Sequence, residues 1–148
     1  VNAIGDPITK MKVMKKLEKS KNIYPVLIHP SVICSDRIEI GEGTIICAGN
    51  ILTVNIKIGK HVIINLDCMI GHDVILGDYT TVLSSANVSG AVNIGKCVSI
   101  GTGSAIIQGL NIGDNTIIGA GAVVVTDLPP NCTAVGVPAK PIKFHNKI

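Results

Sequence analysis

The sequence predicts an all-β solenoid, a parallel β-helix of about six coils, because it repeats every six residues. From residue 28 to residue 124 an aliphatic side chain returns at every sixth position, and only Cys34 is not Ile, Leu or Val. Glycine follows that residue in eight of the seventeen hexads, and the fifth hexad position is mostly small or apolar. Three such strand-and-turn units close one coil of a parallel β-helix. Residues 18 apart should therefore stack at the spacing of paired strands, about 4.8 Å.

The composition supports a narrow tube rather than an ordinary globular core. The 148 residues suffice for one domain and include only two Tyr, one Phe and no Trp, so stacked β-branched side chains must fill the interior. The sequence contains no run of about 18 apolar residues that would predict a membrane span, and it shows no recognisable signal peptide. The chain begins with Val, which suggests a fragment or a processed protein.

Charge and cysteine usage point away from nucleic acid and from disulfides. The net charge is +3, and the lysine clusters near the two ends lack the interleaved aromatics of nucleic-acid-binding surfaces. Five cysteines form no CxxC pair, which is typical of reduced thiols in a cytoplasmic protein. Cys68 falls on an inward hexad position and is expected to fill the core.

Residues 1–27 do not follow the hexad. A short strand is expected over residues 1–5 and another over residues 23–28, and Asp6-Pro7 should begin a helix between them. Within that helix Ile8, Met11, Met14 and Leu17 recur at helical spacing, with lysines between them. This piece is either the end of an α/β domain that binds substrate or a cap on the solenoid.

The repeat occupies residues 28–129 without an insertion and ends at two prolines, which cannot donate hydrogen bonds to a sheet. Residues 130–148 are expected to leave the solenoid as an extended tail.

Several segments resemble one family closely. They are His29-Pro30-Ser31, Asn65, Ile70-Gly71-His72-Asp73, Val88-Ser89-Gly90, residues 118–124 and the tail residues 135–140. Together with the hexads, these segments resemble the hexapeptide-repeat acyltransferases of the left-handed β-helix superfamily. Within them, the chain is similar to the sugar O- or N-acetyltransferases of the NeuD and PglD type.

The resemblance implies a left-handed coil, acetyl-CoA as co-substrate, no metal, and a homotrimer with active sites between subunits. It implies that His72 is the general base that deprotonates a sugar amine or hydroxyl, and that Asp73 orients its imidazole. The other reading of His72 and Asp73 is that they are exposed turn residues. The acceptor implied is a nucleotide-linked sugar or sialic acid.

Further site residues follow from the resemblance or from the 18-residue spacing. Gly90 should stack on His72 and offer its N–H to the oxyanion, unless it only eases a turn. Asn65 is expected to position substrate or to bond turn backbone. Thr81 stands where many relatives carry a second histidine that contacts the acetyl donor. Threonine can donate a hydrogen bond but cannot act as an acid or base near pH 7.

A column of small residues is expected from the same spacing. It comprises Ser84, Thr102 and Ala120, which either line a lane for the pantetheine arm of coenzyme A or simply pack a turn. Lys140 and Lys143 in the tail would meet the coenzyme's phosphates or remain solvated.

Three other functions are known or possible for a chain of this fold. A zinc carbonic anhydrase of this fold would need three well-placed histidines, and His29, His61, His72 and His145 include no close pair. A non-catalytic trimeric scaffold is the second alternative. A serine acetyltransferase would require a far longer helical N-terminal region than residues 7–20.

Overall fold

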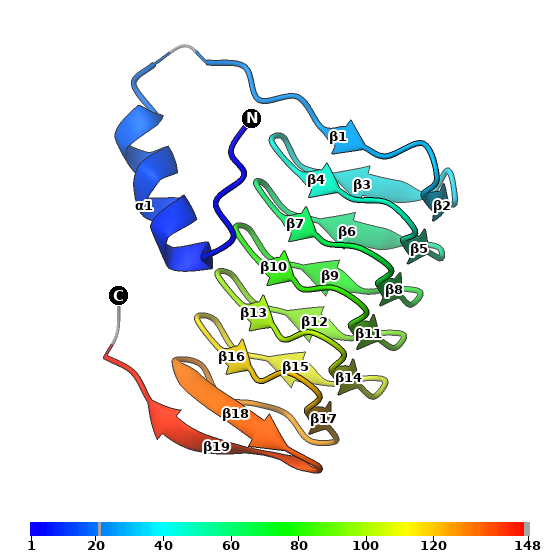
Figure 1. Ribbon diagram of the computed structural model, residues 1–148, viewed down its shortest axis with the longest axis vertical. Helices are drawn as coiled ribbons and strands as arrows, with labels where there is room; N and C mark the ends of the chain where they lie inside the picture. Colours follow the sequence, from blue (N-terminus) through cyan, green and yellow to red (C-terminus); the bar gives the residue numbers. More distant parts are fainter. Residues whose placement is uncertain (21, 147–148) are drawn as a thin grey trace.

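Three sheets, parallel except for the last strand of one of them, form the walls of the solenoid in a computed structural model that describes residues 1–20 and 22–146 (Figure 1). Sheet A contains β1 (Leu27–Ile28), β4 (Ile45–Ile46), β7 (Ile63–Ile64), β10 (Thr81–Val82), β13 (Ser99–Ile100), β16 (Ile117–Ile118), β18 (Cys132–Gly136) and β19 (Ala139–Phe144). Sheet B contains β2 (Ile33–Cys34), β5 (Ile51–Leu52), β8 (Met69–Ile70), β11 (Asn87–Val88), β14 (Ala105–Ile106) and β17 (Val123–Val124). Sheet C contains β3 (Ile38–Ile40), β6 (Ile56–Ile58), β9 (Ile75–Leu76), β12 (Asn93–Ile94) and β15 (Asn111–Ile112).

The register confirms the predicted spacing. Val82 pairs with Ile64 on one side and with Ile100 on the other, 18 residues away in each direction. The same offset joins β8 to β11 and β9 to β12. Sequence distance therefore translates directly into position along the solenoid.

The hexad also predicts the core correctly over most of the length. From Ile46 to Val124 every first-position residue is at most 4% exposed, and Cys68 is 1% exposed as expected. The first coil differs, because it has a neighbouring coil on one side only. There Ile28 remains 43% exposed and Cys34 is also exposed.

The chain turns three times per coil, and the turns stack into three corners. The A–B corner includes residues 65–68 and 83–86, the B–C corner includes 71–74 and 89–92, and the C–A corner includes 59–62 and 77–80. The last residue of each corner range, such as Cys68 or Val74, is buried in the core, whereas most of the other corner side chains are at least partly exposed. Polar side chains of one protomer can therefore contact each other when they lie on the same corner.

The predicted helix is present as α1 (Pro7–Leu17), which lies alongside sheet A (Figure 1). Asp6 caps it as expected, because its Oδ1 accepts a hydrogen bond from the Thr9 N–H at 2.8 Å. The buried face differs from the predicted one: Leu17 is exposed, whereas Lys10 is completely buried. The buried face of α1 is set by its contacts with sheet A, so the spacing of its apolar residues alone does not predict it.

The buried Lys10 amine reaches sheet A through polar contacts. Its Nζ donates to the Thr81 hydroxyl at 3.0 Å and lies 3.4 Å from the Thr80 carbonyl oxygen. Thr81 in turn donates to the Gly5 carbonyl oxygen at 2.8 Å. Burial lowers the pKa of Lys10 to about 8.

The expected strands before the repeat are mostly absent. Residues 1–5 form no strand, and of residues 23–28 only Leu27–Ile28 pair in a sheet. Asn2 explains part of this, because its side chain accepts a hydrogen bond from the Ile4 N–H at 3.1 Å and competes with extended pairing.

No helix in the described ranges is both long and apolar enough to cross a membrane.

The tail does not leave the solenoid as expected. β18 pairs in parallel with β16 as a further rung of sheet A, and β19 returns antiparallel to it. The reason lies in the alternation of Cys132, Thr133 and Ala134, which buries the first and third side chains completely. The hairpin closes this end of the tube.

Candidate active site

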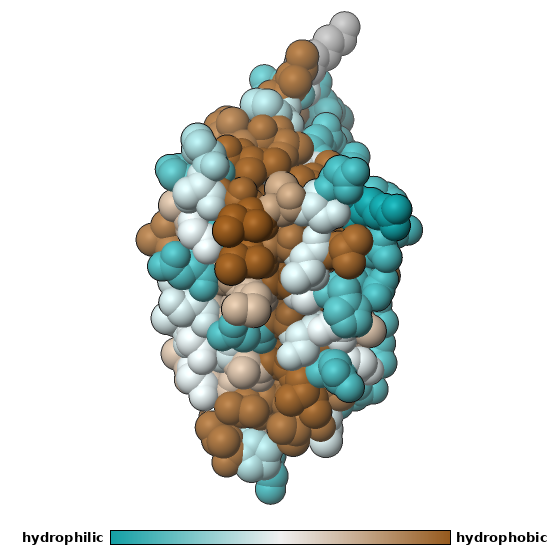
Figure 2. All heavy atoms as spheres, turned by 90° about the vertical axis from the view of Figure 1, so that its right-hand side faces the viewer, coloured by the Kyte–Doolittle hydropathy of each residue, from teal (hydrophilic) through white to brown (hydrophobic). Residues whose placement is uncertain are grey.

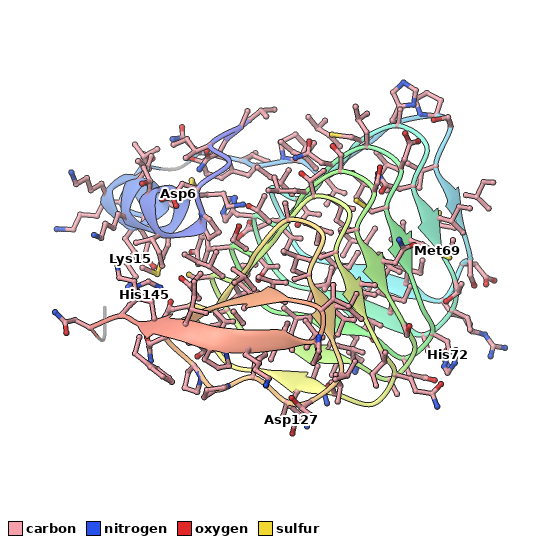
Figure 3. All side chains as sticks on the ribbon, turned by 60° about the horizontal axis from the view of Figure 1, so that its bottom comes forward. Asp6, Lys15, Met69, His72, Asp127 and His145 are labelled. Carbon is pink, nitrogen blue, oxygen red and sulfur yellow. The ribbon has the colours of Figure 1, made fainter. Side chains whose placement is uncertain are left out.

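His72 and Asp73 form a pair at the B–C corner, between β8 and β9. His72 Nδ1 lies 2.8 Å from Asp73 Oδ2, and the two side chains are 62% and 54% exposed. Figure 3 shows His72 on the side of the molecule opposite α1, near Met69 of sheet B. The pair is therefore open to a substrate that approaches this corner.

The backbone holds this corner in place from both neighbouring coils. Asp73 adopts a left-handed conformation with φ 58°, and its N–H donates to the Val54 carbonyl oxygen at 3.0 Å. The His72 carbonyl oxygen accepts from the Ala91 N–H at 2.7 Å. Short aspartate side chains tolerate this conformation because they bond locally.

A hydrogen bond from His72 is the main reason that the pKa of Asp73 lies below its ordinary value, and a second bond from Asn55 adds to it. The carboxyl therefore stays ionised at neutral pH. An ionised neighbour favours the imidazole tautomer that carries its proton on Nδ1 and leaves Nε2 free to accept one.

Gly90 stacks on His72 one coil further along, as the spacing predicts. The imidazole ring lies directly against the glycine, since a Cβ built on Gly90 would collide with His72 Nε2 and Cε1. Within residues 1–20 and 22–146 the Gly90 N–H has no hydrogen-bond acceptor. The ring position, rather than the turn, is what requires glycine here.

Asn65 and the small-residue column lie at the A–B corner, on the other edge of sheet B. The stacking of the column is confirmed, because Ser84 O accepts from Gly103 N at 3.0 Å and Thr102 O accepts from Gly121 N at 2.8 Å. Ala120 follows in the same column and is exposed. Within one protomer these residues do not reach His72.

Thr81 is the clearest correction among the predicted site residues. It is 1% exposed beneath α1, where its hydroxyl is taken up by Lys10 and Gly5. Its expected contact with the acetyl donor is therefore wrong, because the helix covers this part of sheet A. Lys140 lies exposed on β19, beyond the last coil.

Sequence reasoning missed Asn55, whose Nδ2 donates to Asp73 Oδ1 at 3.3 Å. The signal was available, since Asn55 precedes Asp73 by one coil. Both residues border a depression of about 560 Å³ on sheet C, which Arg37 and Lys57 also line.

The histidines do not converge on a metal. His72 stands at the B–C corner, whereas His61 is buried at the C–A corner and His145 bonds Thr133 on the tail at 2.8 Å. Among the residues that the structure describes, no group of three His, Cys, Asp or Glu side chains is arranged to hold a metal ion.

Sheet B presents an exposed apolar face between the two corners that carry the predicted residues. Figure 2 shows hydrophobic side chains gathered along the middle of this face. Ile33, Ile51 and Met69 point outward from it and are 66%, 38% and 49% exposed. The exposed Asn87 of β11 interrupts this face. Exposed apolar surface of this kind often marks an interface.

No protein-family model and no curated protein matches the chain. Among solved structures, it is similar to PerB from Caulobacter crescentus in complex with CoA and GDP-perosamine. That match has a TM-score of 0.92 and 36% sequence identity and covers 95% of this chain and 68% of that one. The chain is also similar to the acetyltransferase domain of PglB from Neisseria gonorrhoeae (TM-score 0.91, 31% identity, 95% and 68% covered), which has been solved with acetyl coenzyme A as well. A third similar structure is WeeI from Acinetobacter baumannii (TM-score 0.90, 35% identity, 95% and 68% covered).

Proposed function

This chain belongs to the hexapeptide-repeat sugar acetyltransferases of the left-handed β-helix superfamily, and we propose that His72 is its general base. It transfers acetyl from acetyl-CoA to a sugar. The observation that carries the role of His72 is its placement: an exposed imidazole, held by an ionised carboxylate and seated against a glycine. A relative, perosamine N-acetyltransferase, has been solved with one histidine replaced by asparagine or alanine, which agrees with a histidine-dependent reaction.

In the proposed step, His72 Nε2 accepts a proton from the sugar amine while the amine nitrogen bonds to the thioester carbonyl carbon. Gly90 donates its free N–H to the oxyanion that forms. The C–S bond then breaks, and His72 returns the proton to the leaving thiolate, so that amide and free thiol are the products.

Transfer is direct in this proposal, without an acyl-enzyme. Cys68 is the cysteine nearest to His72 in the sequence, but it is buried, and its thiol donates to the Leu83 carbonyl oxygen at 3.2 Å. Burial raises the pKa of Cys68, which disfavours the thiolate needed for nucleophilic attack.

A homotrimer completes the site. If three copies turn sheet B toward a three-fold axis, the B–C corner of one protomer lies beside the A–B corner of the next. That arrangement brings His72 next to the neighbour's column of Ser84, Thr102 and Ala120, which would then carry the pantetheine arm. Asn65 of the neighbour would face the acceptor, and Lys140 would meet the coenzyme's phosphates.

The acceptor we favour is the amino group of a nucleotide-linked sugar, which the relative PerB binds as GDP-perosamine. A hydroxyl of sialic acid is the alternative acceptor. A cytoplasmic location forms part of the proposal, because acetyl-CoA is made there and the five cysteines are free thiols.

The decisive experiment follows release of free thiol from acetyl-CoA with a panel of nucleotide-linked amino sugars and sialic acids. His72→Gln should lower kcat by about 10²–10⁴-fold, the usual contribution of a general base. His145→Gln is the matched control, since that histidine lies on the tail hairpin, and should retain wild-type turnover. Unchanged turnover in His72→Gln would exclude its role as base.

The trimer is tested separately with Met69→Lys, which places a charge on the apolar face of sheet B. We expect monomers in sedimentation and loss of most activity, because the site needs two protomers. Lys12→Glu, on the exposed surface of α1, is the control for altered surface charge. A trimeric, active Met69→Lys protein would show that sheet B is not the interface.

A further inference from the structure

Four residues stack in one column along the B–C corner, each one coil from the next. They are Arg37, Asn55, Asp73 and Ala91. The amide of Asn55 donates to Asp73 Oδ1, and Asp73 Oδ2 contacts His72 Nδ1. Each carboxylate oxygen of Asp73 therefore has one partner of its own.

The backbone sets this contact rather than a flexible side chain. Asn55 and Asp73 both adopt left-handed conformations, with φ 56° and 58°. The Asp73 N–H is bound by Val54, the residue before Asn55. Because both side chains are short and their backbones are held one coil apart, the Asn55 amide and the Asp73 carboxylate have little freedom to meet in another geometry.

A similar amide ladder occurs elsewhere in the described part of this fold, with no imidazole bonded to its side chains. Asn115, with φ 58°, donates its Nδ2 to Asn131 Oδ1 at 3.0 Å at the C–A corner. The ladder itself is therefore a structural device. At the B–C corner its acceptor is a carboxylate that also holds an imidazole, which adds a chemical consequence.

We propose that Asn55 is a positioning residue for acetyl transfer, acting on His72 through Asp73; this rests on the proposed role of His72 as the base. A primary amide offers N–H donors to a carboxylate. Asn55 occupies Oδ1 and directs Oδ2 to His72 Nδ1, which keeps Nε2 beside Gly90 as the proton acceptor.

The charged side chains around Asn55 and Asp73 balance one another, so a charge added at position 55 would change the local electrostatics. Asp36, Glu39, Arg37 and Lys57 line the depression beside Asn55 and Asp73, two of each sign, and Lys57 lies 3.8 Å from Glu39. Asn55→Asp would add one negative charge at nearly constant size. It would also remove the donor to Asp73.

Steady-state kinetics of Asn55→Gly and Asn55→Asp test the proposal, with Asn115→Gly as the matched control. Glycine tolerates the left-handed backbone, so Asn55→Gly removes the amide without strain. We expect kcat to fall about 5–10-fold, the equivalent of about 1 kcal/mol or one ordinary hydrogen bond, because Asn55 acts on the base only through Asp73; the KM for acetyl-CoA should stay unchanged. Asn115→Gly should keep the wild-type kcat.

The pH profile of kcat/KM supplies a readout that a purely structural role would not move. In Asn55→Asp the added charge favours the imidazolium, so the acidic limb should shift to higher pH by about half a unit or more. If His72→Gln loses turnover while both Asn55 variants match Asn115→Gly in kcat and in pH profile, the positioning role of Asn55 is overturned and the role of His72 as base stands. If His72→Gln remains active, the proposed function fails first.

Discussion

Two histidines of this chain lie against glycines of a neighbouring coil, yet they occupy opposite environments. At the B–C corner, His72 lies against Gly90, is 62% exposed and has a carboxylate partner. At the C–A corner, His61 lies against Gly43 and is only 5% exposed.

The cover of the C–A corner explains this difference. Tyr24 meets the His61 ring edge-on at 5.1 Å between ring centroids, and Tyr79 stacks on it at 5.6 Å. His61 Nδ1 is buried with no hydrogen-bond partner among the described residues, and burial lowers the pKa of this histidine. A histidine seated on glycine is therefore a feature of the fold, and His72 differs from His61 in its exposure and its carboxylate partner, both of which its proposed role as a base requires.

The largest effects should come from placing a methyl group on each glycine. Gly43→Ala must push against a ring held by two tyrosines, at a position with φ 70°, so we expect a loss of about 2–4 kcal/mol in unfolding free energy. Gly90→Ala meets an exposed ring that can swing away, so stability should change by less than about 1 kcal/mol. Its kcat should instead fall about 10²-fold, because the base is displaced.

Chemical denaturation and thiol-release kinetics on both variants check this contrast. If Gly90→Ala loses as much stability as Gly43→Ala, exposure does not distinguish the two corners. If Gly90→Ala keeps full activity, the ring position of His72 is irrelevant to transfer.

A smaller effect should come from Lys10, the buried amine beneath the helix that covers this side of sheet A. Its folded pKa of about 8 lies below the ordinary 10.5, so the unfolded chain binds more protons between these values and stability rises with pH across them. Lys10→Met removes this pH-dependent contribution to stability, which amounts to at most about 3.4 kcal/mol. Its activity should remain unchanged.

The difference between wild type and Lys10→Met must be followed from pH 7 to 10.5, because burial also raises the pKa values of Cys97 and Tyr79 above their ordinary values of 9.0 and 10.0, so these groups add their own pH dependence to stability. Burial is the main cause at Lys10, and Cys97 and Asp6 partly oppose it. A constant difference across this range would show that Lys10 keeps its ordinary titration in the folded protein.

The periodicity of the sequence was sufficient for the solenoid, its core and the stacking of His72 on Gly90. Every sixth side chain points inward because three equal walls close each coil, so residues such as Ile64, Ile70 and Leu76 are buried as predicted. The helix start at Asp6 was equally local, since it depends on one capping side chain. The family resemblance added the expected roles of His72 and Asp73.

The errors arose where packing joined distant segments. Thr81 and Lys10 are 71 residues apart, and no periodic pattern indicates that α1 lies on sheet A and buries them together. The tail was expected to extend away from the solenoid, but β18 pairs with the free edge of β16 and buries Cys132 and Ala134.

A strict six-residue period assigns each residue to a coil and to one of the three sheets or corners, so these positions follow from residue numbers alone. Which corners stay open depends on how distant segments pack in the tertiary structure. α1 lies along sheet A, Tyr24 and Tyr79 enclose His61, and the B–C corner remains exposed beside the apolar face of sheet B. Exposure depends on contacts between segments far apart in the chain, and a local repeat carries no record of them.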